Sequence, residues 1–170
     1  MVVGPVQLKL HVLGDSILRQ KAAVVKDVGP SERILMAAMV EAMHEFKGVG
    51  LAAPQVGIDL QIFVIDIGSG PHAFVNPKIL KRSGACSQEE GCLSVPGFAV
   101  RVKRPAKISV RYTDENNQTV ERELTELMAR VFQHEYDHLQ GKMIVDYAGW
   151  RKRRTINQHF AKRAKEPPVI

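Results

Sequence analysis

Apolar residues recur along this chain with two different periods, and each period predicts one kind of element. From Ser31 to Phe46 they return every three or four residues, which places them on one face of an α-helix that Ser31 is expected to cap. Other stretches alternate or are rich in β-branched residues and predict strands: Gln61–Ile67, His72–Val75 (which Asn76-Pro77 should end), Lys107–Tyr112 and Thr119–Leu124. Strands gathered between helices, rather than alternating with them, indicate an α+β fold.

The stretch Gly48–Gly57 follows the first predicted helix and cannot continue it. Glycines flank small residues here, which indicates a backbone held close to a ligand or to another segment. A phosphate-binding loop does not fit, because no Gly-Lys-Ser/Thr follows and no strand precedes the stretch.

A second helix is expected from Leu127 to Leu139, with Thr125 as its cap and Gly141 as its stop. At about 100° per residue, one continuous arc of this helix combines apolar residues with three polar ones: His134, Leu127, His138, Val131, Glu135, Met128, Leu139 and Phe132. This arc is expected to face inward. Two histidines and an acid turned toward a core are costly unless they have a partner.

The polar residues of that arc form the motif H-E-x-x-H. His134 and His138 are four residues apart, so both imidazoles lie on one helical face and can close on one divalent ion. Glu135 would then lie near any water that the metal holds. The alternative is that these are ordinary polar residues of a half-buried helix; the cost of burying them favours the metal.

A catalytic metal usually has three protein ligands and one open position. After His138, Ile144 occupies the place where metzincins carry a third histidine. Glu166 lies in a basic tail, and Asp146 lies on a stretch, Lys142–Tyr147, that is expected to be extended. The best upstream candidate is Cys92, because a thiolate binds divalent metals strongly and Cys92 follows glycine in a Gly/Ser/Pro-rich loop. Its alternative role is that of a small buried apolar residue.

Composition narrows the class of protein. The chain has 170 residues, 45% hydrophobic and 25% charged, which are ordinary values for one globular domain. No apolar run approaches the roughly 18 residues that a membrane span needs, and Met1–Leu10 lacks the order of a signal peptide. The two cysteines, Cys86 and Cys92, are therefore expected to be reduced thiols in the cytoplasm.

The net charge of +6 belongs to one end of the chain. Residues 151–170 contain seven basic side chains and one acidic one, so residues 1–150 sum to zero. We expect residues 1–150 to form a single catalytic domain and residues 151–170 a basic C-terminal tail, helical from Trp150 to Lys165.

Three separated motifs together resemble the peptide deformylase family: Gly48-Val49-Gly50-Leu51-Ala52-Ala53-Pro54-Gln55, Glu90-Gly91-Cys92-Leu93-Ser94 and Gln133-His134-Glu135-Tyr136-Asp137-His138. The resemblance covers most of residues 8–150. It implies an α+β fold with antiparallel sheets around a central metal-binding helix, an N-terminal amphipathic helix and a C-terminal basic helix. It also implies a reaction, the removal of formate from N-formyl-methionine on newly made polypeptides.

The resemblance further implies roles for individual residues. Cys92, His134 and His138 would hold the metal, and Glu135 would act as general acid/base when a metal-bound water attacks the formyl carbonyl. Other roles carried over are oxyanion donors (the Gln55 amide and the Leu93 backbone N–H), substrate-binding positions (Val49, Gly50, Gly91, Leu127 and Val131) and an ion pair that fixes the Cys92 loop (Glu90 and Arg104). Arg130 departs from the apolar residue usual in the family at the rim of the methionine pocket.

The ligand types alone suggest zinc, whereas the resemblance implies Fe²⁺ in the cell, with Zn²⁺, Ni²⁺ or Co²⁺ possible in preparations. Expected partners are N-formyl-methionyl nascent peptides, together with ribosomal RNA through the basic residues 151–165. Two other functions remain open from the residues: a zinc endopeptidase that shares H-E-x-x-H, and a non-enzymatic basic module that binds RNA or the ribosome.

Overall fold

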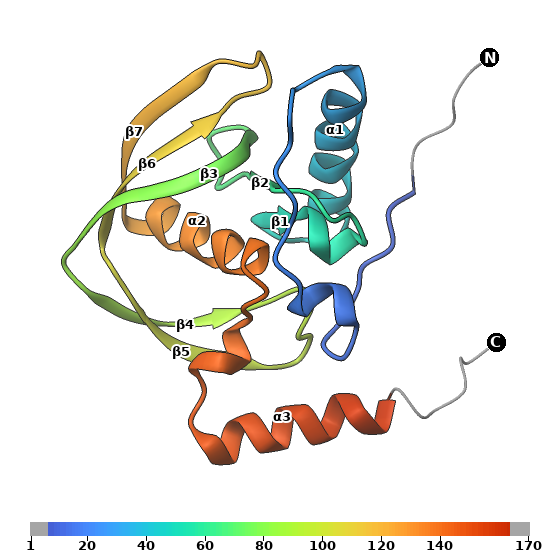
Figure 1. Cartoon of the computed structure of the whole chain (residues 1–170). Helices are drawn as coiled ribbons and strands as arrows, with labels where there is room; N and C mark the ends of the chain where they lie inside the picture. The colour runs from blue at the N-terminus through green and yellow to red at the C-terminus, as the bar shows by residue number, and fades with distance from the viewer. Residues whose placement is uncertain (1–6, 164–170) are drawn as a thin grey trace.

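A computed structural model describes residues 7–163, which form two antiparallel sheets and three α-helices (Figure 1). The five-stranded sheet has the order β1-β2-β3-β6-β7, with strands β1 (Gly50–Ala52), β2 (Ile62–Ile65), β3 (His72–Ser83), β6 (Lys107–Thr113) and β7 (Thr119–Thr125). The other two strands, β4 (Cys86–Gly91) and β5 (Ala99–Arg104), form a separate hairpin that we call the β4–β5 ribbon. The helices are α1 (Pro30–Glu45), α2 (Glu126–Leu139) and α3 (Trp150–Arg163), with the 3₁₀ turns η1 (Ser16–Arg19), η2 (Ala53–Val56) and η3 (Ile144–Tyr147).

The α+β class and the antiparallel sheets agree with the expectation from the sequence. Within residues 7–163, no helix is both long and apolar enough to cross a membrane. Residues 164 and 165 of the predicted C-terminal helix lie outside the described range.

Helix α1 begins slightly earlier than its sequence pattern predicts. Gly29, not Ser31, is the N-cap, and its N–H donates a hydrogen bond to the Glu32 carboxylate at 2.9 Å. Pro30 takes the first helical position, where its missing N–H costs nothing. The helix buries a methionine-rich stripe against β1 and β2.

Helix α2 crosses the middle of the molecule, between the five-stranded sheet and the β4–β5 ribbon (Figure 1). It starts directly after Thr125 and ends before Gly141, whose φ of +70° favours glycine, as the sequence predicts. On the sheet side, the Phe132 ring packs edge-on against Phe63 and Phe74 at centroid distances of 5.0 and 5.1 Å.

The two sides of α2 differ in chemistry. Its apolar residues share a core with β2, β3, β6 and β7. The apolar residues of the ribbon, Val100 and Val102, instead pack with η3 and with Ile156 and Phe160 of α3. The contact between α2 and the ribbon is therefore made by polar and charged side chains.

Two local predictions are wrong. Strand β3 does not end at Asn76-Pro77, because Asn76 adopts a φ of +48° and the strand continues through an irregular register to Ser83. The stretch Lys142–Tyr147 is not extended, since it contains η3, and Asp146 there accepts the Met143 N–H at 2.9 Å.

Candidate functional site

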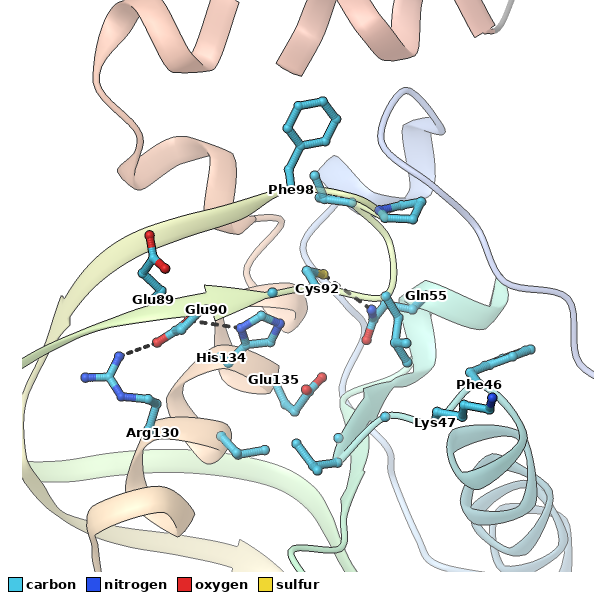
Figure 2. A pocket seen from close by; sticks show the side chains of 18 of the residues that line it. Phe46, Lys47, Gln55, Glu89, Glu90, Cys92, Phe98, Arg130, His134 and Glu135 are labelled. Carbon is cyan, nitrogen blue, oxygen red and sulfur yellow. Dashed lines mark hydrogen bonds and ion pairs between the residues drawn. The ribbon is translucent and has the colours of Figure 1, made fainter. Parts of the chain in front are cut away.

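A thiol and two imidazoles meet where the β4–β5 ribbon reaches α2. Cys92 follows the last residue of β4 and faces His134 of α2 (Figure 2), and His138 lies one turn further along the same helix. One potential ligand atom from each residue lies within 4.8 Å of the other two, and Cys92 Sγ is 3.4 Å from His138 Nε2. The structure thus brings together all three residues that the sequence nominated as metal ligands.

The first histidine is oriented by an acid on the ribbon. His134 Nδ1 lies 3.0 Å from a carboxylate oxygen of Glu90, which leaves its Nε2 for the centre of the cluster (Figure 2). Burial lowers the pKa of His134, but hydrogen bonds to Cys92 and Glu90 outweigh it and hold the pKa well above its usual value. A histidine ligand whose other nitrogen donates to a carboxylate is the usual arrangement at metal sites.

The second histidine is held neutral. Burial holds the pKa of His138 well below its usual value, and the nearby positive charge of His134 lowers it further. A neutral imidazole beside a cysteine sulfur, with a second imidazole across from them, is a donor set that fits Zn²⁺ or Fe²⁺. The residues present therefore fit one divalent metal.

Glu135 lies beside this cluster and is buried. Its Oε2 has no hydrogen-bond partner among the described residues, so one acceptor remains free for a bound molecule. Burial, the largest cause, raises the pKa of Glu135 to about 7, although the charges of His134 and Arg104 oppose the shift. A carboxyl group with a pKa near neutrality can both take up and release a proton.

The glycine-rich stretch approaches two distant segments. A Cβ on Gly50 would lie 2.9 Å from the Cδ of Glu135, and a Cβ on Gly48 would lie 2.7 Å from the Leu93 side chain. Both distances are shorter than real Cβ contacts, so a side chain at either glycine would force the Glu135 carboxyl group or the Leu93 side chain to shift. The expectation of a backbone held close to another segment is confirmed.

Gln55 is buried, with its amide held in one orientation. Its Oε1 accepts the Ala52 N–H at 2.9 Å, so Nε2 must face the other way, where it lies 3.1 Å from Ser94 Oγ. The same Nε2 is 3.8 Å from Cys92 Sγ (Figure 2). The amide N–H groups therefore point toward the cluster. Ser94, which sequence reasoning assigned no role, is the acceptor that helps to hold them there.

A pocket of about 700 Å³ opens onto Glu135 and Cys92. All five residues predicted to contact substrate line it: Val49, Gly50, Gly91, Leu127 and Val131. Leu93 and His134 also border it. The pocket is lined both by apolar side chains and by members of the polar cluster, which suits a ligand with an apolar side chain and a reactive polar group.

The acid that orients His134 belongs to a buried network of charges. Arg104 donates to both oxygens of Glu90, at 2.7 and 2.9 Å, and to Asp137 at 2.9 Å. Burial raises the pKa of Glu90, but the hydrogen bonds from His134 and Arg104 dominate and lower it to about 2. The predicted contact between Glu90 and Arg104 is present.

Arg130 is a member of this network that sequence reasoning did not identify. Its guanidinium lies 2.5 Å from Glu90 (Figure 2), so it is buried in the wall of the pocket and does not stand free at a rim. One signal was present in the sequence: Arg130 lies four residues before His134, on the same helical face.

The described residues give no support to an endopeptidase site with a ligand downstream of His138. Within residues 7–163, the only group of three or more potential ligands is the one that contains Cys92. Ile144 is buried in the core with β5 and α3, and Asp146 accepts hydrogen bonds from Arg19 and Arg153.

Comparison with known proteins agrees with this geometry. The sequence profile of the polypeptide deformylases matches residues 7–154. The peptide deformylase of Thermotoga neapolitana is 42% identical over 158 residues, which are 92% of this chain and 96% of that protein.

Solved structures are similar as well. The crystal structure of the Thermotoga maritima peptide deformylase has a TM-score of 0.82 at 42% identity and covers 84% of this chain and 98% of that one. The peptide deformylase of Ehrlichia chaffeensis in complex with actinonin has a TM-score of 0.88 at 34% identity and covers 94% of this chain and 98% of that one. This chain therefore belongs to the peptide deformylase family.

Proposed function

We propose that Cys92, His134 and His138 hold the divalent metal with which this enzyme removes the formyl group from N-formyl-methionine at the start of new polypeptides. Formate and a free N-terminal amine are the products. The observation that carries the assignment is the meeting of one sulfur and two imidazoles within 4.8 Å, beside a carboxyl group with a free oxygen. When bound, the metal supplies a Lewis acid that polarises the formyl oxygen and makes a water molecule more acidic.

Glu135 is proposed as the group that moves the proton. Its free Oε2 accepts a proton from the water that attacks the formyl carbon, and the same carboxyl group then gives the proton to the departing amine nitrogen. The C–N bond breaks as this nitrogen is protonated. The raised pKa of Glu135, about 7, matches both halves of this task.

The negative charge that develops on the formyl oxygen needs donors at that point. We assign this role to the Gln55 side-chain amide and the Leu93 backbone N–H. The Ala52 and Ser94 contacts of Gln55 support the assignment, because they fix the direction of the amide before substrate arrives. A donor held in place in this way needs no reorganisation during the reaction.

Substrate is proposed to bind as an extended chain along β1. This strand forms one edge of the five-stranded sheet, so the outer backbone groups at Gly50 are available to a peptide, whereas the carbonyl oxygen of the preceding Val49 accepts the Asp66 N–H at 2.9 Å. Gly91, at the end of β4, would face the substrate from the opposite side. The methionine side chain would occupy the apolar wall formed by Val49, Leu127 and Val131.

Formate release from a formyl-Met peptide tests these roles. In Glu135→Gln we expect activity to fall by at least about 100-fold while metal content stays at one per chain. In Cys92→Ala we expect the metal itself to be lost or weakly held. A Glu135→Gln variant that retains full activity, or a Cys92→Ala variant that retains full metal content, would contradict the proposal.

The metal in the cell is proposed to be Fe²⁺. The donor set suits both iron and zinc, and zinc binds more tightly by ligand type alone. The two are distinguished by elemental analysis of protein purified without oxygen from cells grown on ordinary medium. Zinc at one equivalent in such a preparation would contradict the choice of iron.

We propose that residues 1–150 form the catalytic domain and that residues 151–170 form a basic tail attached to it. The tail is proposed to contact ribosomal RNA. Lys152 and Arg154 are exposed on α3, and Trp150 is 69% exposed at its start. Deleting the helix would expose Val100 and Val102, which Ile156 and Phe160 of α3 help to bury, so charge substitution is the cleaner test. We expect Lys152→Glu with Arg154→Glu to weaken ribosome binding and reduce its salt dependence, with formate release unchanged.

A cytoplasmic location is proposed with this partner, because nascent chains emerge there and both cysteines are free thiols. Cell fractionation tests it. Recovery of the enzyme in an oxidising compartment, with a disulfide between Cys86 and Cys92, would contradict it.

A further inference from the structure

The ligands of the candidate metal site come from two elements that share no apolar core. His134 and His138 belong to α2, whose apolar side chains pack into the five-stranded sheet. Cys92 follows β4, and the apolar residues of the ribbon pack with η3 and α3. The distance between sulfur and imidazoles therefore depends on polar contacts across the boundary between α2 and the β4–β5 ribbon.

Arg130 makes three of these contacts from one side chain. One guanidinium nitrogen lies 2.5 Å from Glu90 Oε1 and 3.2 Å from the carbonyl oxygen of Val102, and the other donates to the carbonyl oxygen of Cys86 at 2.7 Å. Glu90 and Cys86 are on β4, and Val102 is on β5. A single residue of α2 thus holds both strands of the ribbon.

Arg130 also shares its carboxylate with a metal ligand. Figure 2 shows Glu90 between Arg130 and His134. Glu90 Oε1 accepts hydrogen bonds from Arg130 and Arg104, and Oε2 accepts one from Arg104 and lies 3.0 Å from His134 Nδ1. With Asp137 on the far side of Arg104, the network contains two acids and two arginines. Without Arg130, Glu90 and the carbonyl oxygens of Cys86 and Val102 would each lose a buried hydrogen-bond donor, which is costly.

Arg130 lines the wall of the pocket, but its terminal nitrogens are directed away from a substrate. Both are engaged with β4 and β5, and the side chain is only 8% exposed. A direct contact with the peptide would require these bonds to break.

We propose that Arg130 is a positioning residue of the metal site: it clamps α2 to both strands of the β4–β5 ribbon and thereby sets the separation of the Cys92 sulfur from the two imidazoles. The inference rests on the proposed function, because it takes these three residues as the metal ligands. Residues that orient ligands in this way typically change metal affinity or activity by about 10- to 100-fold when mutated.

Cobalt provides a direct readout, because thiolate–Co²⁺ bonds absorb in the near ultraviolet and imidazole–thiolate geometry shapes the visible bands. Wild type, Arg130→Leu and Arg130→Lys are loaded with Co²⁺ without oxygen, and cobalt loss to excess EDTA is followed by absorbance. Arg101→Leu, which replaces an exposed arginine on β5, is the matched control. Circular dichroism and thermal unfolding are measured on the same samples.

In Arg130→Leu we expect cobalt loss to be at least about tenfold faster and the visible bands to change, with the helix and strand content of wild type. Arg130→Lys is expected to lie between the two, because a single ammonium cannot reach all three acceptors. Arg101→Leu should match wild type. If Arg130→Leu does not fold, Arg130→Lys decides: faster cobalt loss supports the clamp, and the wild-type rate overturns it.

Other outcomes are also informative. Lower thermal stability of Arg130→Leu with a wild-type spectrum and wild-type cobalt loss would reduce Arg130 to a general structural role and overturn the inference. Failure of the wild-type enzyme to bind cobalt through Cys92, shown by an unchanged near-ultraviolet band in Cys92→Ala, would instead overturn the proposed ligand set.

Discussion

Gly50 and Glu135 meet although 85 positions separate them in the chain. Because Gly50 has no side chain, the Glu135 carboxyl group can lie where a Cβ at residue 50 would be. The same relation holds between Gly48 and Leu93. In each pair a glycine of the first motif makes room for a residue of another motif, which is a physical reason for the motifs to occur together.

Replacing Gly50 by alanine is expected to push the Glu135 carboxyl group out of position. Formate release should fall by about 100-fold or more, the range typical for loss of a general acid/base, while metal content stays unchanged. Gly149→Ala is the control, because a Cβ there meets nothing within 4 Å. An activity of Gly50→Ala within about twofold of wild type would show that Glu135 does not depend on this space.

Single residues differ in how far their roles could be predicted from the sequence. His134, Glu135 and His138 could be predicted because one helical turn fixes their relation, and Cys92 because its loop composition and its motif agree. For Arg130 the sequence shows only its position four residues before His134; its partners could not be predicted, because two of them are backbone carbonyl oxygens on strands distant in sequence.

Among the elements, β3 shows why a correct local signal led to a wrong boundary. The pair Asn76-Pro77 does break regular pairing, since the register with β6 shifts between Val75 and Lys78. The strand nevertheless continues, because Asn tolerates the left-handed backbone that absorbs the extra residue. The Asn76 side chain then accepts the Val25 N–H at 2.9 Å and donates to the Val25 carbonyl at 2.7 Å.

Replacing Asn76 by alanine should destabilise the protein by about 2–4 kcal/mol, from two lost hydrogen bonds and from strain at positive φ. Asn76→Gly loses the same bonds without that strain, so we expect it to be about 1 kcal/mol more stable than Asn76→Ala. Urea unfolding measures both, with the exposed Asn116→Ala as control. Equal stability of Asn76→Ala and wild type would refute the role of this bulge as an anchor for residue 25.

Over the whole molecule, Asp146 joins its own turn, η3, to the neighbouring helix α3 and to Arg19, which is 127 positions away in sequence. It accepts hydrogen bonds from Arg19 at 2.6 Å, from the Met143 N–H at 2.9 Å and from Arg153 of α3 at 3.2 Å. Burial raises its pKa, but the hydrogen bonds from Arg19 and Met143 dominate and lower it below the usual value. The charged form is therefore the one that stabilises the fold.

The lowered pKa of Asp146 determines how its contribution to stability depends on pH. The contribution of Asp146 is complete above the unfolded pKa of about 3.9 and is lost as the pH falls through the lower folded value. We expect Asp146→Asn to lower the free energy of unfolding at pH 6 by about 1–2 kcal/mol, and by progressively less below about pH 4. Unfolding by urea from pH 6 to pH 3 measures this, with Glu41→Gln, an exposed residue of α1, as control. A difference between Asp146→Asn and wild type that stays constant with pH would contradict the assignment.

The α+β class could be predicted for the molecule as a whole, because helical and alternating patterns occupy separate stretches of the chain. The separate apolar groups on the two sides of α2 could not be predicted, because the sequence of α2 shows only one arc of residues that is expected to face inward. Gln133 and Arg130 lie outside that arc and are buried all the same: Arg130 donates to the ribbon, and Gln133 donates to the carbonyl oxygen of Pro105, directly after β5. Polar side chains that are buried in ion pairs or hydrogen bonds leave no hydrophobic period to detect.

The separation of the two apolar groups has a consequence for assembly. Each side of α2 contains its own packed interior, so each is expected to gain its shape without help from the ion. The metal then cross-links two regions, one on each side of α2, that are already folded. Oxidation of the Cys92 sulfur would remove this cross-link while both regions stay folded. An inactivated, metal-free enzyme of this kind would be repaired by a reductant and fresh metal alone, with no refolding.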